Sequence, residues 1–168
     1  MILPGKLNLK GVIGTTFDAI LLIYPSEYGN LKWPIEEEDP FWQSGETYEV
    51  EQVRFGTDAK AYVAKIASTG VNPVGDVSGH WEKLTPFDLT GCSAEFKMGI
   101  DQDSPFFSIT TGSGIVLGGA AGTVSITAKP AQTILVPVPE KVKYGLLITE
   151  AGGNLYEYVE GITNWKHQ

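Results

Sequence analysis

The sequence has very few of the residues that carry most enzyme chemistry. Its 168 residues include one cysteine, Cys92, and two histidines, His80 and His167. One cysteine forms no internal disulfide and builds no cysteine-rich zinc site. No serine lies in the Gly-x-Ser-x-Gly turn of hydrolases, and no two of the 20 acidic residues stand out as a glycosidase pair. We therefore predict no catalytic residue, no metal site and no cofactor, and we expect a protein that is not an enzyme.

Basic residues and long apolar runs are also scarce. The chain has 12 Lys and Arg residues, of which Arg54 is the one arginine, against 20 Asp and Glu, giving a net charge of −8. Binding to a phosphate backbone needs clustered basic side chains, so nucleic acid is not an expected partner. The sequence contains no apolar window of about 18 residues, so we predict no membrane span. Residues 1–6 lack the pattern of a signal peptide. We expect a soluble protein that binds neither nucleic acid nor membrane.

Turn-forming residues, in contrast, are abundant, with 20 Gly and 10 Pro. Between them, short segments alternate apolar and polar residues with the period of two that is typical of half-buried strands. The continuous apolar run 144–149 instead indicates a strand buried on both faces, and 151–154 predicts the hairpin turn after it. The predicted strands are 7–12, 15–24, 93–100, 107–111, 115–117, 123–128, 144–149 and 155–162. Their spacing of roughly ten residues predicts an all-β fold, a small antiparallel Ig-like β-sandwich.

The composition changes between residues 25 and 84, so we predict a discontinuous sandwich of residues 1–24 and 85–168 with an inserted β-module. Four consecutive acids, Glu36 to Asp39, predict an exposed loop in this module. Gly56-Thr57-Asp58 predicts the turn of a hairpin that joins Glu49–Phe55 to Lys60–Ile66. A unit this small needs its aromatic residues for a core, which favours burial of Trp42 and Trp81 over ligand binding.

The insert resembles the small aromatic modules that bind chitin or cellulose in secreted chitinases. The residues that follow the order of those modules are Trp42, Tyr48, Val53, Tyr62-Val63-Ala64, Gly70, Pro73 and Trp81. The resemblance implies the same scaffold and makes Trp42, Tyr62 and Trp81 candidates for stacking on a glycan. The modules also carry an exposed tryptophan before their Thr-x-Gly loop, and this chain has no aromatic residue in Lys65–Gly70.

The remaining chain is similar to the small β-sandwich at the N-terminus of baseplate upper proteins of tailed bacteriophages. The ordered matches are Asp88-Leu89-Thr90-Gly91, Ala94–Met98, Phe107–Ile109, Gly122–Ile126, Thr133, Tyr144–Ile148 and Glu160–Thr163. The sequence departs from that family at Gly145, where the family usually has aspartate. The resemblance implies a structural virion protein, most simply a tail, baseplate, collar or fibre-attachment component that acts through protein–protein assembly.

Such a protein would contact other virion proteins, in a homo-oligomeric ring or array, and would be located in the virion. Our candidates for the interface are Val136, Pro137, Val138 and Pro139 together with Trp165, since tryptophan is enriched in interface cores. The acidic loop is a further contact for a basic partner surface. Two alternatives stay open: a capsid decoration or head-fibre protein of the same build, and a carbohydrate-binding module that contacts a glycan of the host surface.

Overall fold

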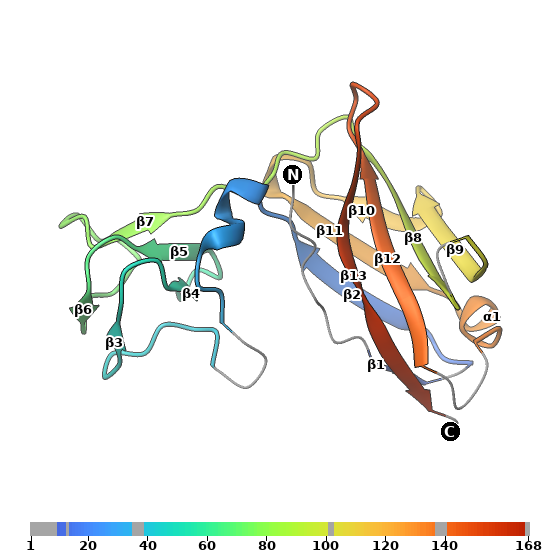
Figure 1. Cartoon of the computed structure of the whole chain (residues 1–168), viewed down its shortest axis with the longest axis horizontal. Helices are drawn as coiled ribbons and strands as arrows, with labels where there is room; N and C mark the ends of the chain where they lie inside the picture. Colours follow the sequence, from blue (N-terminus) through green and yellow to red (C-terminus); the bar gives the residue numbers. More distant parts are fainter. Residues whose placement is uncertain (1–9, 13, 35–38, 101–102, 137–140, 167–168) are drawn as a thin grey trace. The chain divides into compact units, whose positions relative to one another are not determined.

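A computed structural model of the chain describes residues 10–12, 14–34, 39–100, 103–136 and 141–166. The chain divides into two compact units. The first, which we call the sandwich unit, comprises Met1–Ser26 and Pro86–Gln168, and the second, which we call the insert, comprises Glu27–Thr85. Both are built from strands, with a few short helical turns (Figure 1). The predicted all-β class is therefore confirmed.

The sandwich unit contains one hydrogen-bonded sheet of eight strands in the order β1-β13-β12-β8-β9-β10-β11-β2. The strand bounds are Lys10–Val12 (β1), Phe17–Leu22 (β2), Ser93–Gly99 (β8), Pro105–Thr111 (β9), Gly114–Leu117 (β10), Thr123–Ala128 (β11), Lys141–Thr149 (β12) and Leu155–Lys166 (β13). Neighbouring strands are antiparallel except for the pairs β1–β13 and β9–β10, which are parallel. The antiparallel arrangement predicted from the alternating segments thus dominates the sheet.

The sheet folds over on itself at a bend between β9 and β10. At Gly114 the backbone φ is 103°, and a Cβ atom there would lie 2.6 Å from the carbonyl oxygen of Thr127, so only glycine fits. After the bend, β10, β11 and β2 form a second layer, which β12 and β13 cross in Figure 1. The rings of Phe17 on β2 and Phe96 on β8 stack at 6.4 Å although three strands separate β2 from β8 in the sheet order. The two layers therefore enclose a single core.

Most strands direct every second side chain into the core. On β8, Ala94, Phe96 and Met98 are buried, as their alternation predicts. On β12 the prediction that residues 144–149 are buried on both faces is wrong for Leu147 and Thr149, which are only half-buried. The buried cluster comprises Phe17, Leu21, Ile23, Leu89, Ala94, Phe96, Met98, Phe107, Ile109, Ile115, Val124, Ile126, Ala128, Val136, Val142, Tyr144, Leu146 and Ile148.

The insert has two small sheets and a core of its own. Strands β4 (Val53–Phe55), β5 (Ala61–Ala64) and β7 (Trp81–Lys83) form one sheet, and β3 (Thr47–Tyr48) pairs with β6 (Ser68–Thr69). The single strand predicted over residues 49–55 is interrupted at Glu51, whose backbone φ is 72°. This left-handed residue bends the chain, so that β3 and β4 belong to different sheets.

Short helical turns connect some of these strands, and the sequence patterns did not predict them. They are η1 (Ser26–Asn30), η2 (Gly119–Ala121) and α1 (Pro130–Thr133). The fully buried hydroxyl of Thr133 donates to the carbonyl oxygen of Thr15 at 2.7 Å, which ties α1 to the turn before β2. Among the described residues, no helix has the length and apolar character needed to cross a membrane.

Candidate functional surfaces

The Asp-Leu-Thr-Gly motif at residues 88–91 forms a turn at the start of the second part of the sandwich unit. A carboxylate oxygen of Asp88 accepts a hydrogen bond from the amide of Thr90 at 2.9 Å. Hydrogen bonds from the Thr90 side chain and amide lower the pKa of Asp88. Leu89 is buried in the core, and Gly91 has a φ of 76°. Each residue of the motif thus has a structural role in the turn before β8.

Two of the three candidate glycan-stacking residues are buried in the core of the insert. Tyr62 is 7% exposed and Trp81 is 6% exposed. The indole N–H of Trp81 donates to the carbonyl oxygen of Val71 at 2.9 Å, and its ring meets that of Tyr48 edge-on at 5.3 Å. The hydroxyl of Tyr62 donates to Asp58 at 3.0 Å, and burial, together with this bond, raises the pKa of Tyr62. These contacts make both rings part of the scaffold, with almost no face left for a sugar.

The third candidate, Trp42, is half-buried and packs against this core. Its indole Nε1 is buried without a hydrogen-bond partner. Phe41 beside it is 49% exposed and is the one exposed aromatic side chain of the insert in the part of the chain described. In Lys65–Gly70, where the chitin-binding modules carry a tryptophan, Ile66 is the large exposed apolar side chain. In its described residues, the insert therefore presents no row of exposed rings of the kind that polysaccharides stack on.

Ser78 and His80 lie together on an exposed loop of the insert, in an arrangement unlike a catalytic triad. The Ser78 hydroxyl donates to the Asp76 carboxylate, and its oxygen lies 2.7 Å from Nδ1 of His80. Because the one hydroxyl proton is directed to Asp76, the imidazole must act as donor, so it is not placed to take that proton as a general base. Asp76 also accepts from the amides of Ser78 and Trp81, both at 2.8 Å. These bonds, that of the Ser78 hydroxyl foremost, lower the pKa of Asp76 to about 2.

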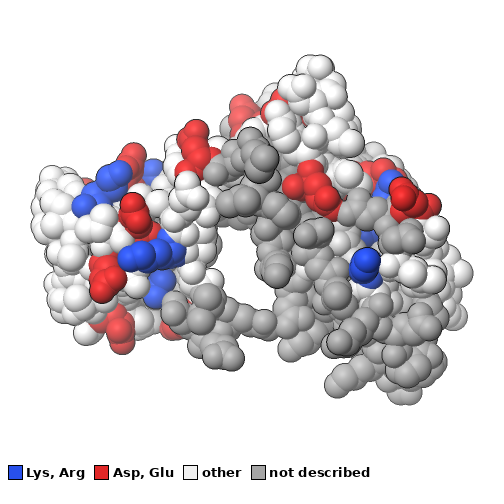
Figure 2. All heavy atoms as spheres, viewed as in Figure 1, with Lys and Arg blue, Asp and Glu red and all other residues white. Residues whose placement is uncertain are grey.

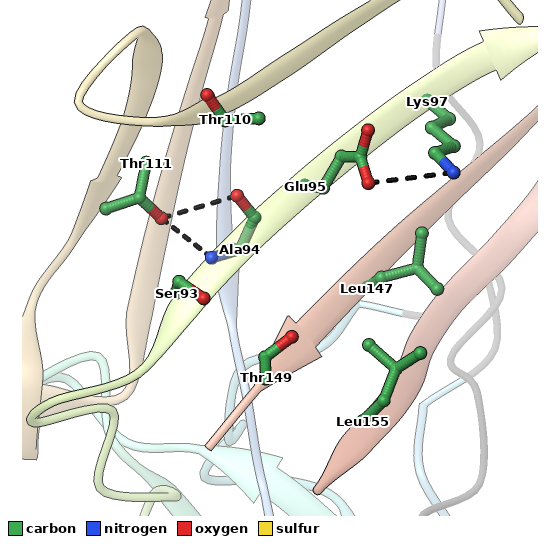
Figure 3. Close-up of a pocket in the computed structure, with 9 residues that line it drawn as sticks. All are labelled: Ser93, Ala94, Glu95, Lys97, Thr110, Thr111, Leu147, Thr149 and Leu155. Atoms are coloured by element: carbon green, nitrogen blue, oxygen red, sulfur yellow. Dashed lines mark hydrogen bonds and ion pairs between the residues drawn. The ribbon is translucent and has the colours of Figure 1, made fainter. Parts of the chain in front are cut away.

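A shallow groove of about 320 Å³ lies on the outer face of the sandwich unit, over β8, β9, β12 and β13 (Figure 3). Glu95 and Lys97 form an ion pair of 3.6 Å along its floor. The hydroxyl of Thr111 accepts from the amide of Ala94 at 2.7 Å, which ties β9 to β8. The lining residues are Ser93, Ala94, Glu95, Lys97, Thr110, Thr111, Leu147, Thr149 and Leu155. Glu95 is the one carboxylate among them, whereas glycoside hydrolysis uses two.

The charged side chains of the insert are mixed rather than grouped by sign. Figure 2 shows acidic and basic residues interspersed over its visible face. Ion pairs of 3.4 Å between Lys32 and Glu49 and of 3.1 Å between Lys65 and Glu82 account for part of this mixing. Among the described residues, no three His, Cys, Asp or Glu side chains are grouped as a metal site would need.

The single cysteine, Cys92, lies in the sandwich unit. Burial, and then the charge of Glu150, raises the pKa of Cys92, which keeps that thiol protonated and weakly nucleophilic.

Of the predicted interface residues, some belong to the core or to a strand of the sandwich unit, and the others lie outside the described residues. Val136 is 2% exposed and belongs to the sandwich core. Pro137, Val138 and Pro139 lie outside the described residues, as do Glu36–Glu38 of the acidic loop. Trp165 lies on β13 opposite Gly11 of β1. The interface role of these residues stays a prediction.

The sheet leaves an edge open that the sequence patterns did not identify. Strand β2 is the last in the sheet order, so it has a neighbour, β11, on one side alone among the described residues. On the outer face, Ile20 of β2 is opposite Ser125 of β11, which is in turn opposite Val116 of β10. Ile20 is 77% exposed and Val116 is 68% exposed. We call this row of Ile20, Ser125 and Val116, together with the free side of β2, the β2 edge.

No protein-family model matches the sequence. No curated protein matches it at a significant level either.

Proposed function

We propose that the chain is a structural protein of a tailed-phage virion, a tail, baseplate, collar or fibre-attachment component that acts by assembly and not by catalysis. The observation that carries this proposal is the β2 edge. A strand that has no neighbour on one side among the described residues, beside exposed apolar side chains, is a surface suited to addition of a further strand. The ordered sequence resemblance to baseplate upper proteins supplies the type of particle.

Among the described residues, the β2 edge lacks most of the features by which proteins usually protect an open strand. Such edges carry charged side chains (lysine above all), proline or a bulge, are very short, or are covered by a helix or loop. Strand β2 spans six residues, contains neither lysine nor proline, and pairs with β11 without a register shift. Asp18 is its one charged residue. An edge of this kind is stable against aggregation when an assembly covers it, as closed symmetric oligomers do.

The pairing of polar groups in the outer groove and in the Asp76 loop supports the part of the proposal that assigns no catalysis to the protein. In the groove the ammonium of Lys97 is paired with the carboxylate of Glu95. In the loop the hydroxyl proton of Ser78 is committed to Asp76. Both sets of groups thus stabilise one another, and neither offers an unengaged base beside a nucleophile.

The test is whether the protein is present in the virion, and where. We expect immunoblotting and mass spectrometry of purified phage particles to detect it, and antibody-gold to label the tail or its tip. Label spread over the head would instead support the capsid decoration or head-fibre alternative. Particles that form normally without the protein, and contain none of it, would overturn the proposal.

A further inference from the structure

The backbone groups of β2 that face away from the sheet can be identified from its register. The amide of Ile23 donates to the carbonyl oxygen of Gly122 at 2.8 Å, in continuation of the pairing of Leu22 with Thr123. In an antiparallel pair, alternate residues direct their N–H and C=O groups toward the partner. Residues 17, 19, 21 and 23 therefore face β11. Asp18, Ile20 and Leu22 direct theirs to the open side.

We propose that β2 pairs antiparallel with β2 of a second copy of this chain, about a two-fold axis at Ile20. Asp18 of each copy then lies opposite Leu22 of the other, and Ile20 lies opposite its own counterpart. The pairing joins the β10-β11-β2 layers of two copies into one continuous layer. The inference rests on the proposed function, because it names the partner that covers the β2 edge.

The exposed side chains match this register. With Ile20 next to its counterpart, the two exposed isoleucines form an apolar cross-strand pair at the centre of the joined layer, flanked on each side by Ser125 and then Val116. Cross-strand aliphatic contacts of this kind stabilise sheets. A single pairing covers both open edges and both copies of Ile20, which is 77% exposed in one copy.

The charges also favour this register over the next one along the strand. A strand rises about 3.4 Å per residue, so the two copies of Asp18 lie roughly 14 Å apart, beyond the Debye length of about 8 Å at physiological salt. A pairing centred on Asp18 would instead place these carboxylates directly opposite each other, which is destabilising. The hydroxyl of Thr127 donates to Asp18 at 2.7 Å and holds the carboxylate on the outer face of its own copy.

A second copy is a better fit than an extended segment of another protein. Both β2 strands are already ordered by their pairing with β11, so their association carries little of the entropy cost of ordering a flexible peptide. One pair of short strands makes a small interface. We therefore expect a monomer–dimer equilibrium that shifts with protein concentration.

Sedimentation velocity of the full-length protein over a concentration series tests the pairing. The wild type should approach twice the monomer mass, and Ile20→Lys should remain monomeric with an unchanged circular dichroism spectrum. Ile66→Lys is the matched control, because it places the same charge at a side chain that is 50% exposed on the insert. This variant should dimerise like the wild type. A monomeric wild type, or equal loss of dimer in both variants, would overturn the proposal.

Disulfide trapping tests the register. Opposed residues in a hydrogen-bonded antiparallel pair have Cα atoms about 5.5 Å apart, within reach of a disulfide. In a Cys92→Ser background, Ile20→Cys should give a covalent dimer on mild oxidation, and Asp18→Cys should not. The reverse pattern, or no trapping with either, would overturn the register. A variant that fails to pair but is still found in the particle would leave the proposed function standing, whereas absence of the wild type from particles would overturn that function whatever its oligomeric state.

Discussion

The amide of Phe87 donates a hydrogen bond of 2.8 Å to the carbonyl oxygen of Ile23, so the two points where the insert leaves and rejoins the sandwich unit are bonded to each other. The amide of Ile23 is bonded in turn to Gly122. At Gly122 the backbone φ is 64°, and a Cβ atom would lie 2.5 Å from that of Pro86. The sandwich unit thus joins its two chain segments through its own hydrogen bonds at this junction.

This closure predicts that the sandwich unit folds without the insert. Replacement of residues 25–85 by a short glycine-containing turn should leave a β-rich protein with a cooperative thermal transition, since the ends to be joined are already in contact. Circular dichroism and the dispersion of amide signals in NMR would check this. A companion variant, Gly122→Ala in the full chain, should lower the melting temperature because it crowds this junction. A shortened protein without dispersed signals would contradict the prediction.

Alternation of apolar and polar residues was sufficient to predict most strands of the sandwich unit. It worked on β8 because one face meets the core and the other meets solvent. It failed for α1, where a single turn starting at Pro130 is too short for a helical period to appear. It also failed for burial of residue 147, because an apolar residue can line a groove on the outer face as well as a core.

The candidate surfaces were harder to predict, for a physical reason. The position of a strand in the sheet depends on pairings between distant segments, such as β2 with β11. The local sequence pattern does not predict these pairings, so it does not predict which strand lies at an edge. The absence of lysine and proline from residues 17–22 was the one available signal. The burial of Trp81, in contrast, followed from the small size of the insert, which needs its large aromatic side chains for a core.

We expect Phe96→Ala to destabilise the sandwich unit strongly. Phe96 is 1% exposed and stacks on Phe17 at 6.4 Å and on Tyr144 at 6.2 Å, so its removal leaves a cavity between the layers. The free energy of unfolding should fall by about 3–5 kcal/mol in urea titrations. Thr110→Ala on the exposed face should change it by less than about 0.5 kcal/mol. Equal effects of the two substitutions would show that the layers do not share this core.

The buried aromatic residues of the insert give a test that separates scaffold from glycan binding. We expect Trp81→Ala to lower the stability of the insert by about 3–5 kcal/mol, because it empties the core and leaves the Val71 carbonyl without its donor. Phe41→Ala, at a side chain that is 49% exposed, is the control and should have little effect on stability. Chemical unfolding and chitin pull-down of both variants would be compared. Loss of glycan binding by Trp81→Ala with unchanged unfolding would establish this residue as a stacking platform instead.

The loop around Asp76 should make the insert sensitive to acid. The hydroxyl of Ser78, and then the amides of Trp81 and Ser78, lower the pKa of Asp76 to about 2 in the folded protein, against about 3.9 when unfolded. A carboxylate whose pKa is lowered on folding stabilises the folded state above its unfolded pKa, and this contribution is lost as the pH falls through the folded pKa. The melting temperature of the insert should therefore fall between about pH 4 and pH 2.

Asp76→Asn isolates the contribution of this carboxylate. The variant should melt at a lower temperature than the wild type at neutral pH, and the difference should shrink as the pH falls through the same window, because the wild type then becomes uncharged at this position too. Glu46→Gln, on an exposed side chain of the same unit, is the matched control and should keep the wild-type profile. Differential scanning calorimetry at a series of pH values provides the measurement. If the melting temperatures of the wild type and Asp76→Asn changed with pH in the same way, the ionised form of Asp76 would not stabilise the loop.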